Sequence, residues 1–351
     1  MLRSHHVCDL LMPATPTATK TATRILPWAT IVGAWLSFCG LLVAIWFAAA
    51  HFHVLETTGG SRASFVASFA LLFAPFWAFG FGAAPLLRRF LHPRWVRVIA
   101  PGLLVSSYLV FALPRGEFQW RYCAALAGIP IAVAVLLEFF THDEPGSRVT
   151  LQWPDLMSLV LLGVPIVMRW LHGAYPHPAL SAMPKLLLAD AALYGFLVVR
   201  GLEGVGYDFR PRWRDLAIGM RELLLFAPFG IGGGFLLGFI GFHRVAPTAW
   251  EFIAGWITTF ILIAIPEELF FRGILLNLLE RCCGPRAALL ISAVAFGFSH
   301  FNKRAVFNWR YVILATIAGI VYGRAWRNRR RLFTSGITHA TVDVIWGTWF
   351  R

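Results

Sequence analysis

The stretch Pro266-Glu267-Glu268-Leu269-Phe270-Phe271-Arg272-Gly273 places three charges inside an apolar run, residues 252–279, that is long enough to span a membrane. A charged side chain near the centre of a bilayer costs about 2.5–3.5 kcal/mol, so such residues usually face the protein interior, pair with one another and mark function. Glu268 and Arg272 stand at i,i+4 in the favoured order and can form an ion pair. Glu267 is then the spare carboxylate, with no cation beside it, and is suited to take and return protons.

The composition extends the membrane assignment to the whole chain. Of the 351 residues, 58% are apolar and only 14% are charged, and the mean hydropathy is +0.67. These values exclude an ordinary soluble domain. Because the apolar segments are continuous runs rather than alternations of polar and apolar residues, we predict an all-α, polytopic membrane helical bundle.

About eleven apolar runs predict about eleven transmembrane helices. We divide the chain into a polar N-terminal tail (residues 1–24), N-terminal transmembrane helices of unassigned role (25–215) and a C-terminal helical core (216–351) that contains the charged stretch 266–273. The runs are residues 25–50, 63–87, 98–113, 122–137, 156–168, 186–199, 223–242, 252–279, 287–301, 311–322 and 332–350.

The net charge of +14 indicates membrane topology rather than nucleic-acid binding. The basic residues gather in short loops, at 88–97, 200–214 and 324–331, the pattern of loops on the cytoplasmic side of a membrane. We therefore expect the lipid bilayer as a partner and no nucleic acid.

Two further polar sets lie in the C-terminal apolar runs: Phe296-Gly297-Phe298-Ser299-His300, and His339-Ala340-Thr341-Val342-Asp343, whose His and Asp share one helix face at i,i+4. Glu267 lies 279 − 267 = 12 residues before the end of its run, and His300 lies 300 − 287 = 13 residues after the start of the next. At a rise of about 1.5 Å per residue, both lie roughly 18–20 Å from the same connecting loop. A short helical hairpin would thus bring Glu267 and His300 to the same level in a polar pocket.

This set of side chains is suited to hydrolysis. A glutamate with a neighbouring histidine can deprotonate a water, and a second histidine with a hydrogen-bonding neighbour can stabilise the oxyanion formed at a carbonyl. Alternatively, Glu267, His300 and His339 are possible ligands of a divalent metal such as zinc, although no His-Glu-x-x-His helix is present. The remaining alternative is a non-catalytic polytopic membrane protein: an immunity factor, a scaffold or a proton- or ion-coupled transporter.

At these residues the chain resembles the CAAX prenyl protease and bacteriocin-processing (CPBP, Abi-type) family of intramembrane endopeptidases. That family is recognised by Glu-Glu-x-x-x-Arg, Phe-x-x-x-His and His-x-x-x-Asn or Asp on successive membrane helices. Here the motifs read Glu267-Glu268-Leu-Phe-Phe-Arg272, Phe296-Gly-Phe-Ser-His300 and His339-Ala-Thr-Val-Asp343. The resemblance covers roughly residues 250–350.

The resemblance implies an endopeptidase that hydrolyses peptide bonds of membrane-associated or prenylated, CAAX-like substrates. Its water would be activated by Glu267 and His300, with His339 and Asp343 as the oxyanion site and Glu268 and Arg272 as a supporting pair. Many members carry Asn where this chain has Asp343; an Asp donates to an oxyanion only when protonated, or it orients His339 instead.

The family has been described both as zinc-dependent and as glutamate peptidases, so the cofactor is open between none and a divalent metal such as zinc. We expect a membrane peptide or lipidated protein as substrate. The expected location is integral and multi-pass, in a bacterial inner (plasma) membrane.

Overall fold

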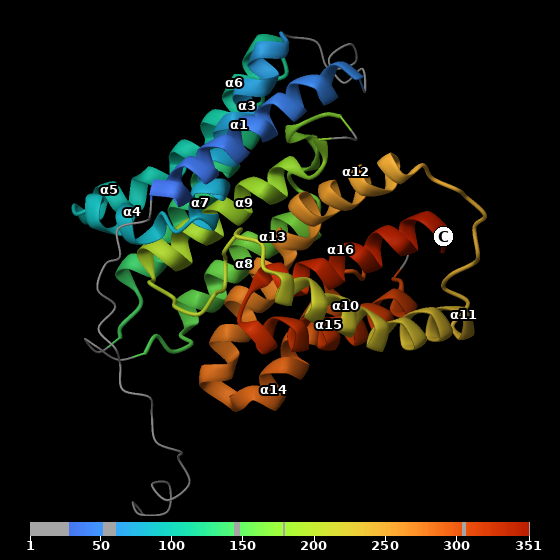
Figure 1. The fold of residues 1–351 in the computed structure, drawn as a ribbon. Helices are drawn as coiled ribbons and strands as arrows, with labels where there is room; N and C mark the ends of the chain where they lie inside the picture. Colours follow the sequence, from blue (N-terminus) through green and yellow to red (C-terminus); the bar gives the residue numbers. More distant parts are fainter. Residues whose placement is uncertain (1–27, 52–60, 144–147, 178–179, 304–306, 351) are drawn as a thin grey trace, which may run out of the picture.

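The computed structural model describes residues 28–51, 61–143, 148–177, 180–303 and 307–350, which form a bundle of helices (Figure 1). Within these ranges there is no strand, only one isolated antiparallel bridge between Phe242 and Phe350. The predicted all-α helical bundle is therefore confirmed. The predicted polar tail, residues 1–24, lies outside the described residues.

The N-terminal part of the bundle is packed through aromatic side chains. In α3 (Arg62–Gly80) the buried residues Phe65, Phe69, Phe73 and Phe76 recur every three or four positions, which places them on one helix face. α3 packs against α6, as Figure 1 shows. The other elements of this part are α1 (Trp28–His51), α4 (Ala84–Phe90), α5 (Arg94–Ile99), η1 (Ala100–Val105), α6 (Ser106–Ala112), η2 (Leu113–Arg115), α7 (Trp120–Phe139), α8 (Trp153–Val167) and η3 (His172–Ala174).

The C-terminal part carries all three sequence motifs. Its long helix α14 bends at Gly284, where φ is +76°, a conformation that glycine adopts at no steric cost. This bend is the turn of the hairpin predicted between residues 279 and 287. The elements are α10 (Trp213–Ala227), η6 (Pro228–Gly232), α11 (Gly233–Leu236), α12 (Ala249–Thr259), η7 (Phe260–Ala264), α13 (Ile265–Glu268), η8 (Leu269–Leu276), α14 (Asn277–Phe298), α15 (Trp309–Arg329) and α16 (Leu332–Trp349).

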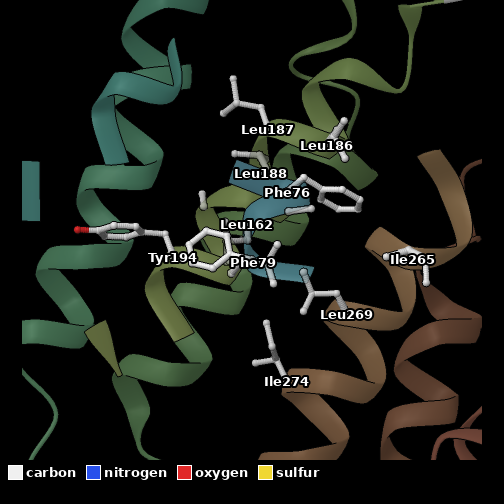
Figure 2. Close-up of a cluster of buried hydrophobic side chains, with 14 of the residues drawn as sticks. Phe76, Phe79, Leu162, Leu186, Leu187, Leu188, Tyr194, Ile265, Leu269 and Ile274 are labelled. Carbon is white, nitrogen blue, oxygen red and sulfur yellow. The ribbon is translucent and has the colours of Figure 1, made fainter. Parts of the chain in front are cut away.

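The helix α9 (Met183–Leu193), continued by the π-helical segment η5 (Tyr194–Val199), joins the two parts. Nearly all of its residues are buried, as expected for a helix in which apolar residues lie on all sides apart from Lys185 and Asp190. It packs against α3, α7 and α8 from the N-terminal part and against η7, α13 and η8 from the C-terminal part. Figure 2 shows this junction, where leucines of α9 gather with Phe76 of α3 and Leu269 of η8.

Each of the eleven predicted runs overlaps one or more helical segments among the described residues. Five helices among the described residues are long and apolar enough to cross a membrane by length and composition; for the other runs a spanning role stays a prediction. These five are Trp28–Phe47, Arg62–Gly80, Arg94–Arg115, Trp120–Phe139 and Trp213–Leu236.

Two predicted boundaries were wrong because the runs were ended at the nearest charge. α10 begins at Trp213 rather than at residue 223, since its buried acid Glu222 is neutralised by Arg221 and Arg324. α15 continues to Arg329 rather than ending at residue 322. The proposed division at residue 215 thus falls inside α10, and the division itself stays a prediction.

A cluster of charged side chains fixes the loop before α10 to the start of α16. Arg331 donates through Nε to Asp215 Oδ2 at 3.0 Å and through Nη1 to Asp208. Thr334 donates to Asp215 Oδ1 at 2.9 Å. Burial raises the pKa of the Asp208 carboxyl, but hydrogen bonds from Arg210 and Arg331 outweigh burial and hold that pKa below its usual value.

Glycines allow α14 and α15 to lie in close contact. A Cβ atom on Gly297 would overlap the side chain of Thr316 and would lie 2.6 Å from the carbonyl oxygen of Val312. On the other helix, a Cβ on Gly319 would lie 3.0 Å from Ala293 Cα. This contact holds the end of α14, which carries His300, against α15.

Candidate active site

Glu267 and Glu268 lie in α13, a single α-helical turn between the π-helical segments η7 and η8. Pro266 precedes them and has no amide hydrogen to donate to the helix ladder. Wider π turns are frequent at functional sites, because they change the direction in which neighbouring side chains project. Here the two adjacent carboxylates reach different partners.

Glu268 is buried and accepts from two motif residues through one oxygen. Its Oε1 lies 2.8 Å from Arg272 Nη1 and 2.9 Å from His339 Nδ1. Arg272 is also buried, donates through Nη2 to the carbonyl oxygen of Gly319 at 3.2 Å, and lies 4.4 Å from the centre of the Phe296 ring. The expected i,i+4 pair is thus present, and it extends to the histidine of the third motif.

Glu267 has a cation beside it, contrary to the sequence interpretation. Its Oε1 accepts from Lys185 Nζ of α9 at 2.7 Å. Its Oε2 is buried, has no hydrogen-bond partner among the described residues, and lies 3.7 Å from His339 Nε2. The interpretation was wrong because it searched for partners only within the helix of Glu267.

Lys185 is the site residue that the motif search missed. It lies outside all three motifs and directly before the predicted run 186–199, where it looks like an ordinary flanking charge. One signal was available: lysine occurs only at positions 20, 185 and 303, whereas the basic loops use arginine. A single lysine at the edge of a buried apolar helix is a candidate for a specific partner.

His300 follows the end of α14 and is only 5% exposed. Its Nδ1 lies 2.9 Å from the carbonyl oxygen of Phe296 and 3.0 Å from Ser299 Oγ. Because a carbonyl oxygen can only accept, Nδ1 carries the hydrogen in this contact. In a neutral ring Nε2 is then the nitrogen with a free lone pair, available to accept a proton.

Aromatic rings surround the two histidines. Tyr322 of α15 stacks on His339 at a centroid distance of 4.7 Å, and Tyr311 contacts His300 edge-on at 4.8 Å. The Phe296 ring contacts both imidazoles. These contacts restrict the rotation of both imidazole rings and exclude water from their faces.

Asp343 lies one helical turn after His339 and is less buried, with 31% of its side chain exposed. Its Oδ2 is 3.5 Å from His339 Nε2. The same nitrogen therefore lies between the carboxylates of Asp343 and Glu267. The third motif is thus in contact with the first.

Two cavities meet at His300. The larger, of about 820 Å³, is lined by Glu267, Lys185, Lys303 and His300 among mostly apolar side chains of α8, α9, η8 and α14. The smaller, of about 280 Å³, lies among α10, α15 and α16 and is lined by His300, His339 and Asp343. Most known ligand sites are likewise apolar hollows with a few convergent polar groups.

The residues here do not fit a resident metal ion. Among the described residues, no group of three or more His, Cys, Asp or Glu side chains is arranged to hold one. Glu267 Oε1 is paired with Lys185, and His339 Nδ1 is paired with Glu268. Lys185 and Lys303 both line the larger cavity and would repel a divalent cation. Glu267, His300 and His339 are therefore poorly suited to hold a divalent metal together.

Comparison with known proteins agrees with the motifs. A family model described as type II CAAX prenyl endopeptidase Rce1-like matches residues 249–345, a range that contains every motif residue named above. A search of curated proteins and a search of solved structures returned no match. Residues 249–345 are thus similar to the type II CAAX prenyl endopeptidase Rce1-like family, in agreement with the three motifs.

Proposed function

We propose that this protein is an intramembrane endopeptidase of the glutamate type, in which Glu267 and His300 activate the attacking water. The observation that carries the proposal is that both side chains line the same cavity of about 820 Å³, although they come from different motifs. The family match to residues 249–345 supports the same reaction class.

Glu267 Oε2 and His300 Nε2 are the two groups available to take a proton from water. Oε2 has no hydrogen-bond partner among the described side chains, and Nδ1 of His300 is occupied at the Phe296 carbonyl. In the proposed step, Glu267 takes one proton from a water held by His300, while the water oxygen attacks the substrate carbonyl carbon. The carbonyl π electrons move to its oxygen, and the proton then passes to the leaving amine as the C–N bond breaks.

His339 is the proposed donor to the developing oxyanion: as an imidazolium it donates through Nε2, while Nδ1 donates to Glu268. Its position is set by Glu268 at Nδ1 and by the Tyr322 ring that stacks on it, so little reorganisation is needed when charge develops. Asp343, 3.5 Å from Nε2, completes this side of the site by orienting the imidazole. Glu268 and Arg272 are the supporting pair.

The proposed substrates are membrane-associated peptides or lipidated, CAAX-like proteins. Mostly apolar side chains line both cavities, which suits a peptide with apolar side chains or a hydrocarbon group. A location in a bacterial inner membrane remains a prediction.

The decisive experiment compares wild type, Glu267→Ala and His300→Ala in detergent on a library of membrane-associated peptides. Loss of a general base is worth about 10²- to 10⁴-fold in rate, so both variants should lose at least about 100-fold. Glu251→Gln and His172→Ala change exposed residues of the same types and should cleave like wild type. Equal cleavage by all five proteins, or no cleavage by wild type, would refute the proposal.

A further inference from the structure

The ion pair between Lys185 and Glu267 joins the two parts of the chain at the proposed catalytic carboxylate. The residues are 82 positions apart, yet Lys185 Nζ lies 2.7 Å from Glu267 Oε1. Lys185 stands in the first turn of α9, the buried helix that packs against α13. It lies outside the matched range 249–345.

The contact makes the two oxygens of Glu267 unequal. Lys185 holds Oε1, whereas Oε2 has no hydrogen-bond partner among the described residues and lies 3.7 Å from His339 Nε2. A general base must present one lone pair in a fixed direction to the proton that it takes. Lys185 therefore determines which carboxylate oxygen is available for that proton.

The other nearby cations also have other partners: Lys303, which lines the same cavity, lies 5.9 Å from the centre of the Tyr311 ring. Arg272 pairs with Glu268, and His339 is shared among Glu268, Asp343 and Glu267. An ionised carboxylate in a low-dielectric bundle requires a compensating charge and hydrogen bonds. Lys185 provides both at a single atom of Glu267.

The surroundings of the pair distinguish positioning from a purely structural contact. Lys185 and Glu267 both line the cavity of about 820 Å³. Their side chains are 23% and 13% exposed to solvent, respectively. By contrast, the side chains of Arg272 and Glu268 are only 1% and 0% exposed. The first pair therefore borders the space where water and substrate would react.

We infer that Lys185 is a positioning residue for the catalytic carboxylate, so that the active site is built by both parts of the chain. This inference rests on the proposed peptidase function. It assigns α9 a role in the reaction, in addition to its packing between the two parts.

The test measures kcat and KM separately for wild type, Lys185→Met, Lys185→Gln and Lys185→Arg on a peptide that wild type cleaves. A misplaced catalytic group can cost about 100-fold, so we expect kcat to fall by about 100-fold in the Met and Gln variants. KM should change less than about threefold, because the lost contact acts in the transition state. Lys185→Arg keeps a cationic donor, so its kcat should be at least about tenfold higher than that of the Met and Gln variants.

Arg94→Met is the matched control, since Arg94 is an exposed cation of the N-terminal part whose side chain is 75% exposed; it should retain wild-type kcat. Thermal unfolding of every variant in detergent separates this effect from misfolding. If Lys185→Met and Lys185→Gln keep wild-type kcat while Glu267→Ala is inactive, the positioning role is refuted but the peptidase survives. The positioning role is also refuted if Arg fails to recover activity in a folded protein. Absence of cleavage by wild type refutes the proposed function instead.

Discussion

Replacing Arg272 with methionine tests whether the enclosed ion pair holds the first motif to the third. Arg272→Met keeps a long apolar side chain and removes the charge. It deletes the 2.8 Å contact to Glu268, the hydrogen bond to the Gly319 carbonyl and the cation over the Phe296 ring. Glu268, whose side chain is fully buried, is left with His339 as its remaining partner.

The charge effect should dominate the loss of stability. Breaking a buried pair by removing one partner costs about 3–5 kcal/mol, whereas an interhelical hydrogen bond in a membrane averages about 0.6 kcal/mol. His339 still contacts Glu268 at 2.9 Å in this variant. We therefore expect the free energy of unfolding to fall by an amount at the lower end of this range, about 3 kcal/mol. The double variant Glu268→Gln, Arg272→Met leaves no unpaired charge and should be less destabilised than the sum of the single variants by at least about 1 kcal/mol.

The free energy of unfolding can be measured by SDS titration in mixed micelles, followed by tryptophan fluorescence. Arg324→Met is the control, because Arg324 is 52% exposed and the carboxylate that it contacts, Glu222, keeps Arg221 as a second partner; we expect a loss below about 1 kcal/mol. A loss below about 1 kcal/mol for Arg272→Met, or strict additivity in the double variant, would refute the reasoning.

Three further outcomes are expected. Gly297→Ala should separate α14 from α15 and lower both thermal stability and cleavage in detergent. Gly255→Ala is the control, because nothing lies within 4 Å of the added Cβ, and it should change neither. Equal stability and equal cleavage of the two variants would contradict the close contact of α14 with α15. Asp208 has a lowered pKa, so its stabilising contribution is present above its unfolded pKa of about 3.9 and is lost as pH falls through the folded value. Unfolding measured at pH 6 and in stronger acid should therefore show wild type and Asp208→Asn converging in acid, and a constant difference would refute this. Finally, cleavage should survive treatment with chelator, checked by metal analysis of the same sample; activity that requires a stoichiometric metal would exclude the metal-free mechanism.

Local sequence patterns predicted the contacts that depend on helix geometry. The i,i+4 spacing of Glu268 and Arg272 predicted their ion pair, and that of His339 and Asp343 predicted a shared face. The equal depths of Glu267 and His300 predicted a common pocket, because both depths are counted from one turn at Gly284. Each of these predictions uses only the helical rise and periodicity.

Contacts between distant segments could not be predicted in this way. Nothing in the spacing of Lys185 and Glu267 relates one to the other, because their distance depends on how α9 packs against α13. The charged start of α10 was missed for the same reason: Asp215 is compensated by Arg331, 116 positions later. A buried charge indicates that a partner exists, but only the packing of the bundle identifies it.

The pairing of Lys185 with Glu267 also has a consequence for biosynthesis. Membrane segments leave the ribosome in chain order, so Lys185 reaches the bilayer before Glu267 has been made. Lys185 lies in the first turn of the buried helix α9, and the acid that compensates its charge is made only 82 residues later. The early helices thus carry an uncompensated charge until the segment with Glu267 is translated, which favours their association with that segment over release into the lipid as a finished unit.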